Sequence, residues 1–263
     1  MTQNPRPPED EPADLETKPF LAHLEDLRWT LIRCGAALLV AVVACAFGVK
    51  LILRLLYHPY RQAGGDPAKL INIDVTGPFS VHMEISLFGG IIAALPFMLY
   101  FIGDFLLPAL MPREKKFLAP VFGAGAMLFV VGVGFCYFLV LSTALRFFDD
   151  YSGWLGISPT WTLKNLIDFE VQMLVAFGIA FELPLILLVL NLLGIVSAAQ
   201  LAAQRRNAIF IIFVAACCIV PSTDLFSLTL MSAPLYVLFE TCIFLARIFD
   251  RRKAAAAKAR PDA

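Results

Sequence analysis

Long apolar runs separated by short polar segments dominate the pattern of this chain. Three of the runs contain no Asp, Glu, Lys or Arg, and they cover residues 85–103, 117–145 and 183–204. A bilayer has a hydrocarbon core about 30 Å thick, and a helix rises about 1.5 Å per residue, so about 20 apolar residues are enough to cross it. The pattern therefore predicts helices that span a membrane.

Applied to the whole chain, this reasoning predicts an all-α, polytopic membrane protein with six transmembrane helices. The expected spans are residues 31–53, 85–107, 118–145, 166–193, 208–220 and 225–248. The fifth would cover only about 20 Å, so the bilayer must thin there or polar groups must snorkel. The segment PSTD at 221–224 predicts a tight hairpin between the last two spans. Residues 19–248 form the expected domain, between a disordered tail at 1–18 and a basic tail at 249–263.

Composition supports the membrane assignment, since 59% of residues are hydrophobic, 16% are charged and the mean hydropathy is +0.77. Orientation follows from Lys and Arg, which concentrate on the cytoplasmic side of membrane proteins. With six spans, 15 of these residues fall on the side of the two termini and six on the other side. Both termini are therefore expected in the cytoplasm. The first apolar run starts about 30 residues in, after an acidic, proline-rich stretch, so no cleavable signal peptide is evident.

One carboxylate interrupts the fourth predicted span. Glu182 lies in AFGIAFELPLILLVL, near the midpoint of the membrane. A charged group there costs roughly 2.5 to 3.5 kcal/mol on insertion scales, so it usually serves a pathway, a partner or a cavity. We expect it to face a cavity and, in at least one stage of assembly, to accept a hydrogen bond from a polar side chain on a partner helix. Pro184 is expected to bend the span beside it. The alternative is a structural hydrogen bond to a neighbouring helix.

The remaining chemistry is sparse. All six cysteines fall within predicted spans, and the three histidines are scattered without a metal-binding spacing. No nucleotide-binding loop or nucleophile motif occurs, so we expect no catalytic residue, no metal and no cofactor. Energy for any work would come from the membrane gradient or from a partner. The basic C-terminal tail is explained by orientation, so nucleic-acid binding is not expected.

Two segments predicted on the cytoplasmic side each carry a carboxylate that could form a pair with the other. The first, KPFLAHLEDLRWTLIR, has apolar residues at helical spacing and polar residues that include Glu25, Asp26 and Arg28. The second, DFLLPALMPREKKFL, carries Glu114 among basic residues. If the two segments fold side by side, Asp26 and Glu114 form a pair that matches consecutive guanidinium groups. The alternative is an ordinary solvated helix face.

At this point the motifs resemble a known family over nearly the whole chain. The segments HLEDLR, FLLPAL with PRE, AFGIAFELP, PSTDLFS and SAPLYVLFE, in this order, resemble TatC, the multispanning subunit of the twin-arginine protein translocase. The resemblance implies a concave six-helix fold in the bacterial inner membrane that works with the proton motive force. It implies a receptor for folded precursors with an Arg-Arg signal peptide, which assembles with single-span TatA/TatB-type subunits and with further copies of itself.

The resemblance also implies roles for individual residues. The signal-peptide site would comprise Asp26, Glu114 and Phe105, with Glu25 and Arg28 beside them. Contacts to partners within the membrane would involve Glu182, Asp224 at the outer hairpin and Glu240.

Two positions depart from the family pattern. Asp26 stands where glutamate is typical, which shortens the side chain by one methylene, and Leu228 stands where enteric relatives have glutamine. The other function that the residues alone leave open is a proton-coupled secondary transporter with Glu182 as the proton carrier. Such folds usually show repeated halves, which we do not detect here.

Overall fold

The structure is a computed structural model that describes residues 20–106, 112–192, 195–219 and 225–258. Its helices are α1 (Phe20–Gln62), α2 (Gly77–Leu106), α3 (Pro112–Phe135), α4 (Leu141–Trp154), α5 (Leu163–Ala180), α6 (Leu183–Leu192), α7 (Ala198–Ala203), α8 (Arg205–Ile219) and α9 (Leu225–Lys258). A short 3-10 helix covers Pro67–Lys69, and a π-helical turn at Cys136–Val140 joins α3 to α4. No strand occurs in the described ranges.

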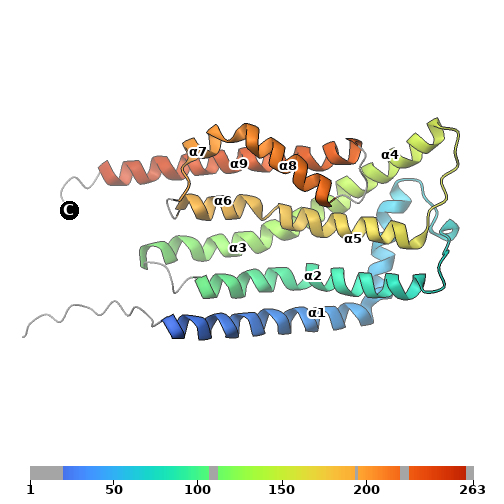
Figure 1. The fold of residues 1–263 in the computed structure, drawn as a ribbon, viewed down its shortest axis with the longest axis horizontal. Helices are drawn as coiled ribbons and strands as arrows, with labels where there is room; N and C mark the ends of the chain where they lie inside the picture. The colour runs from blue at the N-terminus through green and yellow to red at the C-terminus, as the bar shows by residue number, and fades with distance from the viewer. Residues whose placement is uncertain (1–19, 107–111, 193–194, 220–224, 259–263) are drawn as a thin grey trace, which may run out of the picture.

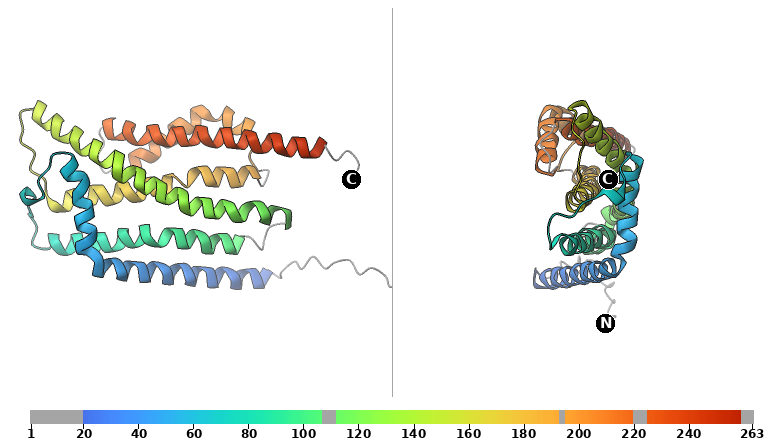
Figure 2. Two further views of the ribbon diagram at one scale, coloured as in Figure 1. Left: turned by 180° about the vertical axis from the view of Figure 1, so that it is seen from behind. Right: turned by 90° about the vertical axis from the view of Figure 1, so that its right-hand side faces the viewer.

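The helices lie lengthwise beside one another (Figure 1). Helix α1 packs on α2, α2 packs on α3 and α5, and α6 and α8 both pack on α9. Along the chain, α3 continues into α4 and α5 into α6, so each pair makes one crossing of the bundle (Figure 2). The buried core follows α5 most closely, because residues on most sides of this helix are shielded from solvent.

Five of the six predicted spans coincide with helices that are long and apolar enough to cross a membrane. These are Leu24–Gln62, Gly77–Phe105, Gly123–Trp154, Leu163–Asn191 and Leu228–Ile248. The predicted fifth span coincides with α8, which has only 15 residues. The sixth crossing therefore stays a prediction, and so does the orientation of the termini.

Several helices extend up to three turns beyond the predicted spans. Helix α1 continues to Gln62 and α4 to Trp154, whereas the predicted spans end at residues 53 and 145. Helix α9 continues to Lys258, into the segment assigned to the basic tail. Apolar runs mark the part of a helix that lies in lipid, and these helices extend beyond that part with polar residues.

Helix α1 continues past the predicted end although it contains a proline. Pro59 has no N–H, so the carbonyl of Leu55, four residues earlier, lacks its usual helical donor. The hydroxyl of Tyr137 donates to this carbonyl at 2.8 Å. The last part of α1 bends away from the rest of the helix (Figure 2), and a hydrogen bond from Nε of Arg146 to the carbonyl oxygen of Gln62, at 3.0 Å, ties it to α4.

A glycine at position 90 allows the close contact between α1 and α2, and its neighbour Gly89 serves as a comparison. A Cβ atom on Gly90 would lie 2.7 Å from the Cα atom of Val42, so only glycine allows the two backbones to come this close. A Cβ atom on Gly89 would be 3.5 Å from the sulfur of Cys45, which is an ordinary contact. Close approach of helices at small residues is a common way to pack in membranes. Gly90 therefore fixes the spacing of the first two helices.

Candidate functional site

The first candidate site lies at the end of the bundle where α1 begins. Glu25 and Arg28 lie one helical turn apart and are both exposed. Nη1 of Arg28 is 3.7 Å from Oε1 of Glu25, so the two form an ion pair. Asp26 is half-buried on a different side of the helix, and its backbone carbonyl accepts a hydrogen bond from the Thr30 hydroxyl at 2.8 Å. Exposed ion pairs contribute about 0 to 1 kcal/mol, so a ligand can displace Arg28 from Glu25 at small cost.

The other predicted members of this site come from the turn between α2 and α3. Phe105 is half-buried in the last turn of α2, and Glu114 belongs to the first turn of α3. The start of α1, the end of α2 and the start of α3 lie at the same end of the bundle (Figure 1). The side chain of Glu114 lies outside the described part of the structure, so its pairing with Asp26 stays a prediction. Asp224 also lies outside the described residues.

Glu182 occupies a break between two helices. Helix α5 ends at Ala180 and α6 starts at Leu183, so the helix is interrupted next to Pro184. A proline in the first turn of a helix loses no helical hydrogen bond, so α6 begins favourably there. The break leaves Glu182 between the two helices, inside the fourth predicted span.

The carboxylate of Glu182 faces α3 and is buried. Its residue is 6% exposed, and neither carboxylate oxygen has a hydrogen-bond partner in the described part of the chain. A Cβ atom on Gly125 would lie 3.1 Å from Oε2, so the glycine leaves room for the carboxylate. In this conformation α3 encloses the carboxylate, so the cavity and the contact with a partner helix stay predictions. Access for a partner would require α3 and α6 to separate at Gly125.

An apolar groove lies next to this break. Its volume is about 660 Å³, and it runs along α9 beside the junction of α5 and α6. The groove is lined by Phe135, Phe181, Thr229, Leu230, Ala233, Pro234, Val237 and Leu238. Pro234 cannot donate to the carbonyl of Leu230, the usual acceptor four residues earlier, so this side of α9 has a backbone acceptor without its helical donor.

Glu240 has partners within the chain. Nη2 of Arg205 donates a hydrogen bond to Oε2 of Glu240 at 2.9 Å. Nε of Arg205 lies 2.9 Å from Oε1 without the geometry of a hydrogen bond, so the ion pair between α9 and the start of α8 has one hydrogen bond. The hydroxyl of Tyr236 also donates to Glu240, at 3.0 Å. Hydrogen bonds between charged groups are shorter and stronger than those between neutral groups. Glu240 thus holds α8 against α9 in this structure.

Leu228 is buried, with 6% of its surface exposed, and belongs to the main core. At this position the side chain packs inside the chain. Leu228, named above as a departure from the family pattern, thus makes a core contact.

Sequence reasoning missed Glu170, the most deeply buried carboxylate among the described residues. It is 0% exposed, and neither of its oxygens has a hydrogen-bond partner there. It lies near Tyr57 of α1 and near Cys136 and Tyr137 of the π-helical turn. The signal was available, since Glu170 lies inside the predicted span 166–193, but the apolar run around Glu182 starts only at residue 171.

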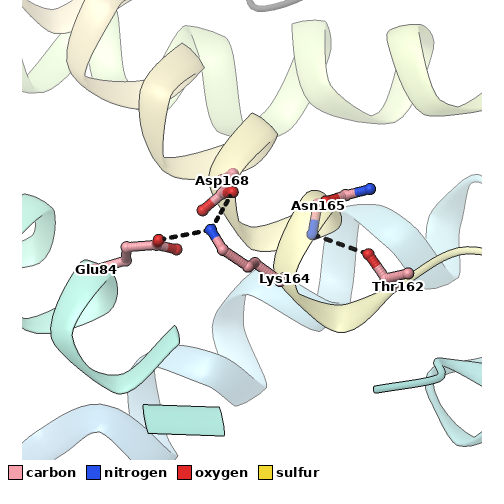
Figure 3. Close-up of polar contacts among 5 residues, drawn as sticks. All are labelled: Glu84, Thr162, Lys164, Asn165 and Asp168. Carbon is pink, nitrogen blue, oxygen red and sulfur yellow. Dashed lines mark hydrogen bonds and ion pairs between the residues drawn. The ribbon is translucent and has the colours of Figure 1, made fainter. Parts of the chain in front are cut away.

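A second polar cluster was also missed. Nζ of Lys164 lies 2.9 Å from Oε1 of Glu84 and 2.7 Å from Oδ2 of Asp168, which links α2 to α5 (Figure 3). Just before α5, the Thr162 hydroxyl accepts a hydrogen bond from the backbone N–H of Asn165 and caps the helix. The spacing of four residues suggests the pair of Lys164 and Asp168 within α5. It gives no sign of the contact between Lys164 and Glu84, which are 80 positions apart.

Comparisons with known proteins identify the family. Residues 22–234 match the family described as Sec-independent protein translocase protein (TatC). This is most of the chain. The chain belongs to the TatC family.

Individual relatives agree with this assignment. The chain is 38% identical to the TatC of Akkermansia muciniphila over 177 residues, 67% of this chain but only 51% of that protein. It is 35% identical to the TatC of Aquifex aeolicus over 92% of this chain and 100% of that protein.

A crystal structure described as the twin arginine translocase receptor TatC in DDM superposes with a TM-score of 0.76 at 35% identity. The match covers 85% of this chain and 99% of that one. This TatC-family member is a subunit of a protein translocase and a multi-pass protein of the bacterial inner membrane. The family favours protein transport over the proton-coupled transport of a solute.

Proposed function

We propose that this TatC-family protein is the receptor for Arg-Arg signal peptides of folded precursor proteins. Support comes from Asp26, which lies near the start of α1 at the end of the bundle where α2 passes into α3. In this proposal both termini are cytoplasmic. Asp26 and Glu114 then bind one arginine each, because a planar guanidinium matches a carboxylate in a bidentate way. Phe105 packs against the peptide beside them.

Neighbouring charges have separate roles in this proposal. Arg28 keeps Glu25 paired until a precursor arrives, and Glu25 then supplies further negative charge. The weak exposed pair makes this exchange inexpensive. Asp26 is one methylene shorter than glutamate, so Asp26→Glu should preserve or improve binding.

The decisive experiment is photocrosslinking of an Arg-Arg precursor to the assembled translocase, together with transport. Losing one charge-assisted contact costs about 1.5 to 3 kcal/mol, so Asp26→Lys or Glu114→Lys should lower occupancy more than tenfold. Asp104→Lys, an exposed residue next to Phe105, controls for general charge effects. Unchanged crosslinking by the double Asp26→Lys and Glu114→Lys variant would refute the assignment.

We further propose that single-span TatA/TatB-type subunits dock on the last two helices. The 660 Å³ groove along α9 supports this, because its apolar lining suits the side chains of a membrane helix. A polar side chain on the partner can donate to the carbonyl of Leu230, and Asp224 would contact the partner at the outer hairpin. Copies of the complex then assemble into larger oligomers.

Glu182 joins this contact after the chain opens. The partner helix separates α6 from α3 at Gly125 and donates a hydrogen bond to the carboxylate. Glu182→Gln should retain part of the transport, and Glu182→Leu should lose most of it. A cysteine at position 182, in a chain without the six native cysteines, should crosslink to the partner. Full transport by Glu182→Leu without a crosslink would return Glu182 to a structural role.

The orientation has its own test. Alkaline phosphatase fused near Gly65 or Gly153 should be active, and fusions near Arg113 or Arg205 should be inactive. The reverse pattern would overturn both the orientation and the receptor proposal.

A further inference from the structure

A second groove lies on the other side of the molecule, between α1 and α2. Its volume is about 550 Å³, and its lining is almost wholly apolar. It is formed by Arg33, Ala36, Ala37, Val40 and Ala41 of α1, and by Ala93, Phe97 and Phe101 of α2. None of these residues belongs to the proposed signal-peptide site or to the proposed partner site on α9.

The groove follows from the sequence of the two helices. They run in opposite directions (Figure 1), so Arg33 and Phe101 belong to one end of the groove, and Ala41 and Ala93 to the other. Just beyond that second end, Gly90 pulls the backbones together at Val42. Small side chains leave space between the helices, and the phenylalanines form one wall.

The shape of the groove suits a lipid chain. It extends from Arg33 to Ala41, about 12 Å along α1. Val40 and Phe97 are 64% and 62% exposed, so this face is unpartnered within the described chain. Both helices are membrane-spanning in length and composition, which means that this face meets the bilayer.

Arg33 gives the groove a charge preference. It is the only charged residue in the lining, it is exposed, and it forms no hydrogen bond or ion pair with another described residue. It lies two residues after the start of the apolar run at residue 31, a depth at which an arginine stem lies along apolar surface while its guanidinium reaches the headgroups. A planar guanidinium binds phosphate oxygens in a bidentate way.

We propose that this groove binds an anionic phospholipid from the leaflet at the N-terminal end of α1. One acyl chain lies between the helices along the alanines, and the phosphate pairs with Arg33. A zwitterionic lipid fits the apolar part equally well, but its own cation competes for the phosphate. The preference for a net negative headgroup is therefore the specific claim.

Trp29 provides a reporter for the headgroup preference. It is exposed and lies four residues before Arg33, on the same side of α1. The variant Trp154→Phe with Trp161→Phe leaves it as the only tryptophan of three. The full chain is reconstituted in phosphatidylcholine vesicles that contain a small fraction of brominated phosphatidylglycerol or, in parallel, brominated phosphatidylcholine.

At equal mole fraction, brominated phosphatidylglycerol should quench Trp29 as if it were enriched about fivefold, equivalent to about 1 kcal/mol. Arg33→Gln should abolish the difference. Arg54→Gln, an exposed arginine elsewhere on α1, should retain it. Equal quenching by the two lipids, or a difference that survives Arg33→Gln, would overturn the proposal. Quenching that falls as the protein-to-lipid ratio rises would assign the groove to a second copy of the chain, and would also overturn it.

Native mass spectrometry gives an independent measurement with all tryptophans in place. The purified protein should retain phosphatidylglycerol in preference to phosphatidylcholine. Arg33→Gln should remove one such adduct, and Ala37→Leu should remove it by filling the groove. Equal retention of both lipids by the unaltered chain would refute the proposal even if the tryptophan variant fails to fold.

Discussion

The hydrogen bond from Tyr137 to the carbonyl of Leu55 offers a sharp test of how the bent end of α1 is held. The two groups are 2.8 Å apart, and the carbonyl lacks its helical donor because residue 59 is proline. Tyr137→Phe removes the hydroxyl but keeps the ring that stacks on His58, with ring centres 6.1 Å apart. The change therefore isolates one hydrogen bond.

The expected cost follows from measured bonds between membrane helices, which average about 0.6 kcal/mol and reach about 1.7 kcal/mol. We expect Tyr137→Phe to lie in the upper half of this range, because the carbonyl is left without another donor. Pro59→Ala restores an N–H that can satisfy Leu55. In that background Tyr137→Phe should cost little, so the coupling between the two positions should be about 1 kcal/mol.

Reversible unfolding in mixed detergent micelles measures all four proteins of this cycle. Tyr151→Phe is the matched control, because Tyr151 is exposed on α4 and its hydroxyl has no hydrogen bond to another described residue. It should leave the free energy of unfolding unchanged. If Tyr137→Phe lowers the free energy of unfolding equally with proline and with alanine at position 59, the hydroxyl does not compensate for the hydrogen bond that Pro59 removes from the carbonyl of Leu55.

Three further changes test the packing and polar contacts by the same unfolding measurement. Gly90→Ala should lower the free energy of unfolding by about 1 to 3 kcal/mol, because the new methyl group meets the backbone of α1. Gly89→Ala should leave it unchanged or raise it by up to about 1 kcal/mol. Equal effects of the two changes would contradict the close approach of the helices at Gly90. Glu170→Leu should stabilise the protein by about 1 to 3 kcal/mol by removing a buried carboxyl without a partner, and a loss of stability would reveal a partner for it. Lys164→Met should lower the free energy of unfolding by about 1 to 3 kcal/mol, and adding Glu84→Gln should recover part of this loss. No recovery would argue against the ion pair between Lys164 and Glu84.

The sequence was sufficient for features that depend on composition along one segment. The apolar runs predicted six membrane spans, and five of them coincide with long apolar helices. Pro184 predicted a bend beside Glu182, where α5 ends and α6 begins. The run alone could not place the ends of α1. The apolar run ends near residue 53, but the helix continues through Pro59, and Tyr137, 82 positions from Leu55, donates to the freed carbonyl.

Contacts between distant segments account for what the sequence could not predict at the candidate site. Glu240 pairs with Arg205, and Glu84 pairs with Lys164, across 35 and 80 positions. Spacing within a helix carries no information about such pairs. The burial of Glu182 against Gly125 likewise depends on how α3 packs, since the charge alone suggested only a cavity or a partner.

The central claim is that carboxylates at the start of α1 and of α3 recognise paired arginines. The most direct measurement is the affinity of the purified protein in nanodiscs for a fluorescent signal peptide with Arg-Arg, compared with the same peptide with Lys-Lys. Lysine keeps the charge but loses the planar fork, so the unaltered chain should prefer Arg-Arg at least tenfold. The double variant Asp26→Asn with Glu114→Gln should bind both peptides weakly and almost equally. An Arg-Arg preference that persists undiminished in this variant would contradict the account.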